Sequence, residues 1–217
     1  MKIHVFTFNP FQENTYIAAD ADGCCVIIDP GMLDEQEDNF LFGFIEHAGY
    51  TPKFILNTHC HLDHILGNKS CKERYSVPLI ASRNELPMLE RAPSASLMWD
   101  VPYRESPLPD QFVSEGDVVS AGDMEFKVLD VPGHSPGHVA FVHYGMGRVF
   151  SGDVLFLGSV GRTDLPLCDA AQLVKSIREK MYTLPEEFVI LPGHGPETTV
   201  GHEKHTNPFV SATYAAF

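Results

Sequence analysis

The chain has 217 residues, 44% of them hydrophobic and 20% charged, which is typical of a globular domain large enough to bury a full core. Its 29 acidic and 15 basic residues give a formal net charge of −14, and such a surface repels nucleic-acid phosphates and anionic lipids. We therefore expect no nucleic-acid partner and no membrane partner. Because no linker-like tract divides the chain, we expect a single domain over residues 1–217.

The sequence shows no signal for export or membrane insertion. The N-terminal segment has no long apolar stretch followed by a cleavage site, and no apolar run approaches membrane-spanning length. The 5 cysteines lie at irregular spacing and form neither a CxxC pair nor a disulfide framework. We therefore expect a cytoplasmic protein. No sequence feature isolates an oligomer interface.

Alternation and apolar periodicity predict strands first and mixed elements afterwards. The first half is predicted to contain strands at 3–8, 14–19 and 24–29, a helix at 34–49, a strand at 53–57 and a helix near 65–75. The second half is predicted to contain strands at 79–81, 118–119, 124–131, 139–143 and 148–151, a helix at 170–182, a strand at 189–191 and a short helix at 200–205. This order predicts two sheets sandwiched between helices.

Residues 83–112 differ from the rest of the chain. They hold many of the prolines together with Met98, Trp99 and Tyr103, and they show no clean period. We interpret the segment as an irregular lid or as part of a pocket wall. For these three side chains, ordinary packing is the favoured interpretation and an apolar pocket is the alternative.

The strongest chemical signal is the segment 58–64, THCHLDH, which directly follows an apolar strand. Such a concentration of imidazoles and carboxylates is costly beside apolar residues unless the groups bind a cation. His59 and His61 lie two residues apart in an extended turn and can face one cation. Asp63 and His64 can face a neighbouring cation. Nitrogen and carboxylate-oxygen ligands of this kind suit zinc, with iron or manganese as alternatives.

Three later residues follow strand ends in the same way. His134 lies in a Gly/Pro turn after one predicted strand, Asp153 follows the next but one, and His194 follows the last. Loops at the ends of a rigid sheet are common places for a functional site. His138 lies in the same turn as His134 and is its competitor as a ligand. Alternation along the segment 58–64 points Cys60 away from the site, so we expect it to pack in the interior.

The ordered set H-x-H-x-D-H, followed by His, Asp and His in GH, GD and PGHG contexts, resembles the metallo-β-lactamase superfamily over nearly the whole chain. The resemblance implies a four-layer αββα sandwich and a hydrolase that uses two divalent metal ions, zinc first among them. The implied ligands are His59, His61 and His134 for the first metal, Asp63, His64 and His194 for the second, and Asp153 as a bridge between both.

The segments 161–166 (GRTDLP) and 192–199 (PGHGPETT) resemble the glyoxalase II-like branch of this superfamily. That resemblance implies a small-molecule thioester substrate such as hydroxyacylglutathione. Two departures leave the thiol carrier open. Glutathione-binding members typically carry a C-terminal helical domain beyond the residues that match here, and they tend to have Lys and Tyr where this chain has Arg162 and Asp164.

The resemblance also implies roles for individual residues. A metal-bridging hydroxide would attack the substrate carbonyl, with Asp63 and Asp153 as catalytic metal ligands and Asp153 also orienting the nucleophile. Arg162 is predicted to bind a substrate carboxylate, and an ion pair with Asp164 is the alternative.

Other functions share parts of this pattern. A persulfide dioxygenase, which uses one iron, shares the NTHCH run and the GRTD segment, whereas the LP continuation and PGHGPET favour a hydrolase. Another ester or a lactone is an alternative substrate. A flavodiiron-type oxygen reductase would need a flavin domain, and non-enzymatic members usually lack ligands that are all present here.

Overall fold

Two six-stranded sheets face each other in the computed structural model, which describes residues 1–210. The first sheet has the order β1-β2-β3-β4-β5-β6 and the second the order β14-β13-β10-β9-β8-β7. The strands of the first sheet are β1 (Lys2–Phe8), β2 (Glu13–Ala19), β3 (Cys24–Ile28), β4 (Thr51–Leu56), β5 (Leu79–Ser82) and β6 (Gln111–Val113). Those of the second are β7 (Val118–Ala121), β8 (Met124–Asp130), β9 (Val139–His143), β10 (Arg148–Gly152), β13 (Val189–Pro192) and β14 (Thr198–Thr199). A separate hairpin consists of β11 (Leu155–Phe156) and β12 (Ser159–Val160).

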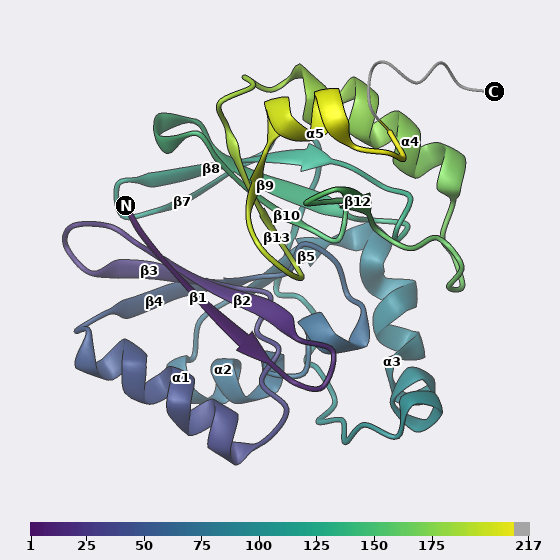
Figure 1. The fold of residues 1–217 in the computed structure, drawn as a ribbon. Helices are drawn as coiled ribbons and strands as arrows, with labels where there is room; N and C mark the ends of the chain where they lie inside the picture. Colours follow the sequence, from purple (N-terminus) through teal and green to yellow (C-terminus); the bar gives the residue numbers. More distant parts are fainter. Residues whose placement is uncertain (211–217) are drawn as a thin grey trace.

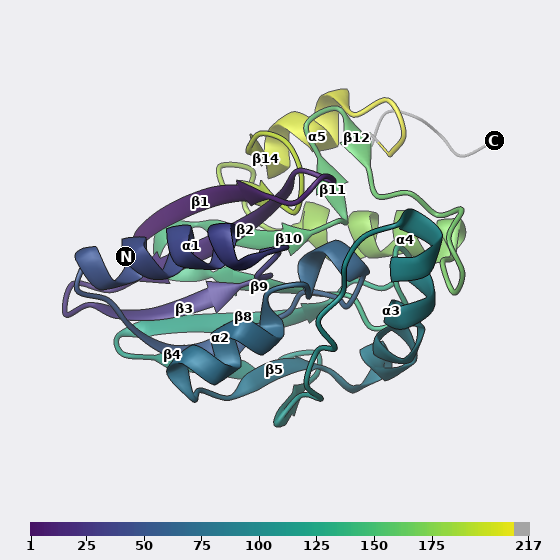
Figure 2. The same cartoon turned by 90° about the horizontal axis from the view of Figure 1, so that it is seen from below.

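Helices cover the outer face of each sheet (Figures 1 and 2). The helices on these faces are α1 (Glu35–His47), α2 (Asn68–Tyr75), α4 (Ala170–Glu179) and α5 (Val200–Thr206), whereas α3 (Leu86–Trp99) lies beside the sandwich and packs against the 3-10 turn at Leu62–His64. The helices α1 and α2 pack on the first sheet through residues such as Leu41 and Cys71. The helices α4 and α5 pack on the second sheet, where Leu173 and Val200 join the same core. The αββα sandwich expected from the sequence is confirmed. Among the described residues, no helix combines the length and the apolar character needed to span a bilayer.

The two sheets are held together by a shared apolar core. Along β8, alternate residues such as Phe126 and Val128 point inward, as the period of two requires. They meet Phe141 and Phe150 of the second sheet and Tyr16 of the first, and the rings of Tyr16 and Phe150 are 5.4 Å apart in an edge-to-face arrangement.

At one end of the sandwich the sheets are also joined through the backbone. The amide of Val139 donates to the carbonyl of Thr58 at 2.8 Å, and the amide of Asn14 donates to the carbonyl of Gly193 at 2.7 Å. β3 and β4 are parallel, as are β10 and β13. Because parallel strands end at the same sheet edge, the loops that follow these strands meet at this junction.

The interpretation of residues 83–112 as irregular is wrong for α3, which is a regular helix over Leu86–Trp99. Pro87 lies in its first turn, where the missing amide hydrogen costs nothing, and Pro93 lies inside the helix. Leu89 and Ala92 bury the inner face of α3 against Leu62. Tertiary packing therefore overrides the local effect of the prolines. The predicted helix at 170–182 is also shorter, since α4 ends at Glu179 and a 3-10 turn follows.

We expect Phe141→Ala to lower the free energy of unfolding by about 3–5 kcal/mol, because Phe141 is fully buried between the sheets and the truncation leaves a cavity. Urea denaturation followed by circular dichroism measures the change. Phe209→Ala is the matched control, since Phe209 is 61% exposed and should shift stability by less than about 0.5 kcal/mol. Equal shifts in the two variants would contradict this account of the core.

Candidate metal centre

The segment between β4 and α2 carries the most concentrated set of polar groups in the site. His59 and His64 are fully buried, whereas His61 and Asp63 are partly open to the adjoining pocket. The chain turns through a short 3-10 helix at Leu62–His64, which places Asp63 and His64 side by side. Cys60 is buried in an apolar cluster with Leu62, on the side away from the histidines, as expected.

The structure gathers the histidines and aspartates singled out in the sequence into two adjacent groups. Within each group, one ligand atom per residue lies within 4.8 Å of the others. The first group is His59, His61 and His134, and the second is Asp63, His64 and His194. These are the two ligand sets that the sequence resemblance implies.

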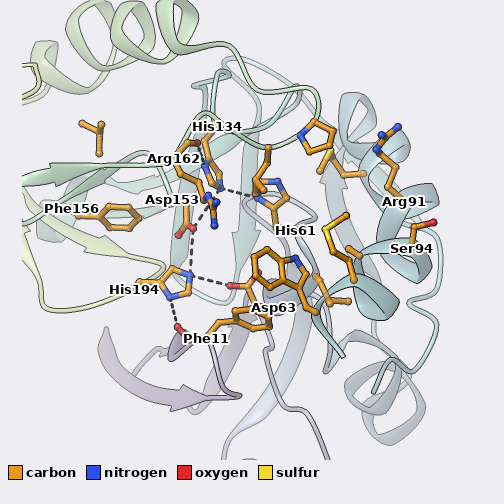
Figure 3. Close-up of a pocket in the computed structure, with 18 of the residues that line it drawn as sticks. Phe11, His61, Asp63, Arg91, Ser94, His134, Asp153, Phe156, Arg162 and His194 are labelled. Atoms are coloured by element: carbon orange, nitrogen blue, oxygen red, sulfur yellow. Dashed lines mark hydrogen bonds and ion pairs between the residues drawn. The ribbon is translucent and has the colours of Figure 1, made fainter. Parts of the chain in front are cut away.

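Asp153 lies between the two groups (Figure 3). Its Oδ1 is 3.5 Å from Nε2 of His64, and its Oδ2 is 3.5 Å from Nε2 of His134 and 3.4 Å from Nε2 of His194. One carboxylate therefore faces ligand atoms of both groups. This is the position required of a bridging ligand.

Several of these buried atoms have no hydrogen-bond partner within residues 1–210. They are Nε2 of His59, His61 and His64 and Oδ1 of Asp153. A buried polar atom without a partner costs about 1–3 kcal/mol, so a cluster of them needs an explanation. Bound cations supply one, because neutral imidazole nitrogens and carboxylate oxygens are good ligands for zinc, iron and manganese. The residues present therefore fit a metal site.

The electrostatics of the first group favour neutral imidazoles. Burial lowers the pKa of His59 well below its usual value, and neighbouring imidazoles add to the effect. Burial, reinforced by His134, lowers the pKa of His61 to about 3. Neutral imidazole is the form that binds a metal ion, so this group is prepared for ligation at neutral pH.

The second group attracts positive charge. Burial opposes protonation of His194, but its hydrogen bonds to Asp153 and Asp63 outweigh burial and raise its pKa to about 10. Burial alone would raise the pKa of Asp153, yet the charge of His64 and the hydrogen bond from His194 hold it well below its usual value. The carboxylates thus concentrate negative charge where a divalent cation would be bound.

Outer hydrogen bonds orient the ligand rings. Nδ1 of His64 lies 3.3 Å from Oδ2 of Asp29, Nδ1 of His134 lies 2.8 Å from the carbonyl of Arg162, and Nδ1 of His194 lies 3.1 Å from the carbonyl of Phe11. Each of these contacts leaves Nε2 facing the centre. Partners of this kind fix both the tautomer and the ring orientation of a metal ligand.

Asp29 is a site residue that the sequence analysis missed. Its Oδ1 accepts a hydrogen bond from the backbone amide of Thr58 at 2.7 Å, and its Oδ2 accepts one from the Thr58 hydroxyl at 2.6 Å. Asp29 thereby ties the end of β3 to the ligand-bearing segment after β4. The available signal was its position directly after a strand and before Pro30, which matches the placement of the assigned ligands.

Glu85 is a second missed residue, and it connects two ligand-bearing loops. Its Oε2 accepts from the amide of Cys60 at 2.7 Å, and its Oε1 accepts from the Ser135 hydroxyl at 2.7 Å and from the amide of Gly137 at 2.6 Å. Burial raises its pKa, although these hydrogen bonds oppose the shift. No local sequence pattern identifies this residue, because all of its partners are distant in the chain.

His138 lies next to the metal-ligand groups without belonging to them. It is fully buried, and its ring stacks on that of His59 with centroids 4.5 Å apart. Its Nε2 accepts a hydrogen bond from the backbone amide of Asp153 at 3.1 Å. Of the two competing histidines, His134 is therefore the one whose geometry suits a ligand.

Two glycines allow the loops to approach one another. A Cβ atom on Gly193 would lie 2.2 Å from Oδ1 of Asp153, and one on Gly152 would lie 2.2 Å from Oγ1 of Thr58. Gly152 also has a positive φ of 50°, a backbone conformation that residues other than glycine rarely adopt. The glycines of the GD and PGH segments are thus needed for the ligands to meet.

A pocket of about 470 Å³ opens beside the metal centre (Figure 3). Besides His61, Asp63, His134, Asp153 and His194, it is lined mostly by apolar side chains. Met98 and Trp99 belong to this wall, whereas Tyr103 packs against the cluster that contains Cys60. Arg162 also lines the pocket, but both oxygens of Asp164 accept hydrogen bonds from its guanidinium at 2.7 and 2.8 Å.

Comparison with known proteins agrees with this geometry. Residues 8–194 match the family model of the metallo-β-lactamase superfamily. The chain is 36% identical over 214 residues to hydroxyacylglutathione hydrolase GloC of Haemophilus influenzae, covering 98% of this chain and 99% of the relative. Among solved structures, it is similar to the B3 metallo-β-lactamase BLEG-1 (TM-score 0.90, 33% identity, 97% and 100% of the two chains). It is also similar to TTHA1623 in a di-iron-bound form (TM-score 0.86, 41% identity, 95% and 99% of the two chains).

The chain therefore belongs to the metallo-β-lactamase superfamily. It is a metallo-hydrolase of that superfamily, and the fold implies divalent metal ions at the His/Asp site.

We expect Asp29→Asn to weaken metal binding about 10- to 100-fold. The asparagine side chain has one acceptor oxygen, so it cannot accept the hydrogen bonds from Thr58 and also offer an acceptor to Nδ1 of His64. Competition with a chromophoric chelator measures the affinity. Asp34→Asn removes the same charge from the exposed N-cap of α1, where Asn caps as well as Asp, and should leave the affinity unchanged. Unaltered affinity in Asp29→Asn would refute the positioning role of Asp29.

Proposed function

We propose that this protein is a binuclear metal-dependent hydrolase that acts on small-molecule thioesters such as hydroxyacylglutathione. The observation that carries the proposal is the position of Asp153 between two ligand groups, beside a largely apolar pocket. The similarity to hydroxyacylglutathione hydrolase GloC over nearly the full length of both chains supports the substrate class. In the reaction, water and a thioester give a carboxylic acid and a thiol.

Divalent cations bound by the two groups would lower the pKa of a shared water toward neutrality and polarise the substrate carbonyl. The chain itself supplies the positions of the ligands and the exclusion of bulk water. Asp153 faces both groups, so it also orients the attacking water. The carbonyl of Arg162 holds the ring of His134 in place, and the side chains of Phe11 and Trp99 shield one side of the pocket.

The leaving group suits a site of this composition. A thiolate departs without obligatory protonation, so the reaction needs no dedicated acid beside the sulfur. Asp63 and Asp153 are the carboxylates nearest the pocket, and both are placed as ligands rather than as free acids. We assign them the catalytic role that the sequence implies, as parts of the metal centre.

Two complete ligand groups favour a binuclear hydrolase over a persulfide dioxygenase, which uses one iron. Zinc is the metal we expect from the donor set. Iron is the alternative, because a similar protein has been solved in a di-iron-bound form. Another ester or a lactone is the alternative substrate class, since a mostly apolar pocket lining does not select for sulfur in the leaving group.

We expect zinc- or iron-loaded protein to release thiol from S-D-lactoylglutathione, and Asp153→Asn to lower kcat/KM by about 100-fold or more, because an amide offers one oxygen where the carboxylate faces both ligand groups with two. A thiol-reactive dye follows the release. Asp169→Asn removes an equal charge at the exposed N-cap of α4 and should retain full activity. No release by protein shown to hold two metal ions would refute the glutathione-thioester assignment.

A further inference from the structure

One side of α3 forms a wall of the pocket. The lining residues of this helix are Met88, Arg91, Ser94, Ala95, Met98 and Trp99. They recur at intervals of three and four residues, which places them on a single helical face. The adjoining face is anchored, because Leu89 and Ala92 are buried in an apolar cluster with Leu62, and the lining residues Met88 and Ala95 pack on the same cluster. The wall is therefore held in place by packing along one side, and Arg91, Met98 and Trp99 are left exposed on the other.

Arg91 is the one lining residue of α3 that carries a charge. Its side chain is exposed, and it makes no hydrogen bond or ion pair with any other residue in the range 1–210. Arg162, the other arginine of the lining, is instead bonded to both oxygens of Asp164. Arg91 thus presents five free donors to the pocket in a planar fork that suits a carboxylate.

The apolar residues beside Arg91 are also available to a ligand. Met98 is 75% exposed and Trp99 is 45% exposed, which is unusual for side chains of this size. The ring of Phe11 meets Trp99 edge to face at 5.9 Å and fixes one side of the indole. An apolar chain lying along α3 would cover this surface and gain free energy from its burial.

Arg91 lies away from the metal centre. Figure 3 shows Arg91 and Ser94 at one end of the pocket, with His194 and Phe156 at the other and His61 between them. An anion bound at Arg91 would therefore leave the space beside Asp63 and Asp153 free for the reacting carbonyl. In a protein of net charge −14, a local cation also offsets the general repulsion of an anionic substrate.

We propose that Arg91 is a specificity-determining residue that binds a carboxylate of the substrate. The substrate would be a thioester that carries this carboxylate at a distance from its reacting carbonyl, with its apolar parts lying along α3. This proposal rests on thioester hydrolysis at the metal centre. The carboxylate belongs either to the thiol carrier, as in glutathione, or to the far end of the acyl chain, and the chemistry that Arg91 recognises is the same.

The kinetic test compares charged thioesters with their neutral esters. S-D-lactoylglutathione and its diethyl ester report on the thiol side, and adipoyl-N-acetylcysteamine and its methyl ester report on the acyl side. We expect the wild type to prefer the charged member of at least one pair by roughly 10- to 100-fold in kcat/KM, as a charged hydrogen bond would give. In Arg91→Gln the ratio of kcat/KM values between the charged and the neutral substrate should fall to near unity, because KM for the charged substrate rises. Arg91→Lys should retain part of the preference.

Arg74→Gln is the matched control, because it removes the same charge from an exposed position on α2 that does not line the pocket. It should keep the wild-type preference, and Arg91→Gln should hydrolyse the neutral esters at the wild-type rate. A preference that survives in Arg91→Gln, or wild-type hydrolysis with no preference in either pair, would overturn the assignment of Arg91.

A binding measurement separates this proposal from the hydrolase function. Trp99 is the only tryptophan of the sequence and lines the pocket, so its fluorescence reports occupancy. The probes are S-hexylglutathione and 6-(ethylthio)hexanoate, which carry no thioester. We expect Arg91→Gln to raise the Kd of at least one probe by about 10-fold or more. Equal Kd values in wild type and Arg91→Gln would overturn the proposal even if no thioester were hydrolysed.

Discussion

The structure depends on a constraint at one edge of the sandwich: buried imidazole nitrogens and carboxylate oxygens need positive charge at their centre. Nε2 of His59, His61 and His64 has no hydrogen-bond partner within residues 1–210, and Asp153 faces both ligand groups. Leaving such groups buried without compensation would cost several kcal/mol, a large fraction of the stability of a domain. A metal ion bound at these groups would therefore stabilise the folded state, because folding brings His134, Asp153 and His194 to the segment that carries His59 and His61.

The sheets make this gathering possible. β10 and β13 run parallel, so Asp153 and His194 leave the same edge of the second sheet. The segment after β4 meets them from the first sheet, where the carbonyl of Thr58 is bonded to the amide of Val139. Loops that leave rigid strands and are hydrogen-bonded to one another hold their side chains more accurately than free loops do. The apolar core between the sheets thus supports the geometry of the site as well as the stability of the fold.

The sequence predicted the parts of the molecule whose signals are local. The longer strands alternate or form apolar runs, and the candidate ligands follow strand ends, so both were predicted. The short strands β6, β11, β12 and β14 have no such pattern and were not predicted, and Asp29 was missed although it too follows a strand. Glu85 was missed because its partners Cys60, Ser135 and Gly137 become neighbours only after folding. The helix α3 was missed because Pro87 and Pro93 count against a helix locally, while the packing of Leu89 and Ala92 decides the outcome. The pair Arg162–Asp164 spans two residues, and it was foreseen as an alternative.

Glu85 also explains how the pocket wall keeps its position relative to the metal centre. It lies directly before α3 and bonds to the loop that carries His59 and His61 and to the loop that carries His134. The helix therefore starts from a point fixed by the ligand loops themselves. The proposed chemistry and the proposed selectivity are then divided between two parts of the structure that are rigidly connected. The strand ends carry the candidate metal ligands, and the open face of α3 carries Arg91 and its apolar neighbours in the pocket wall. A substitution on that face would therefore change the pocket wall without moving the histidines and aspartates of the site.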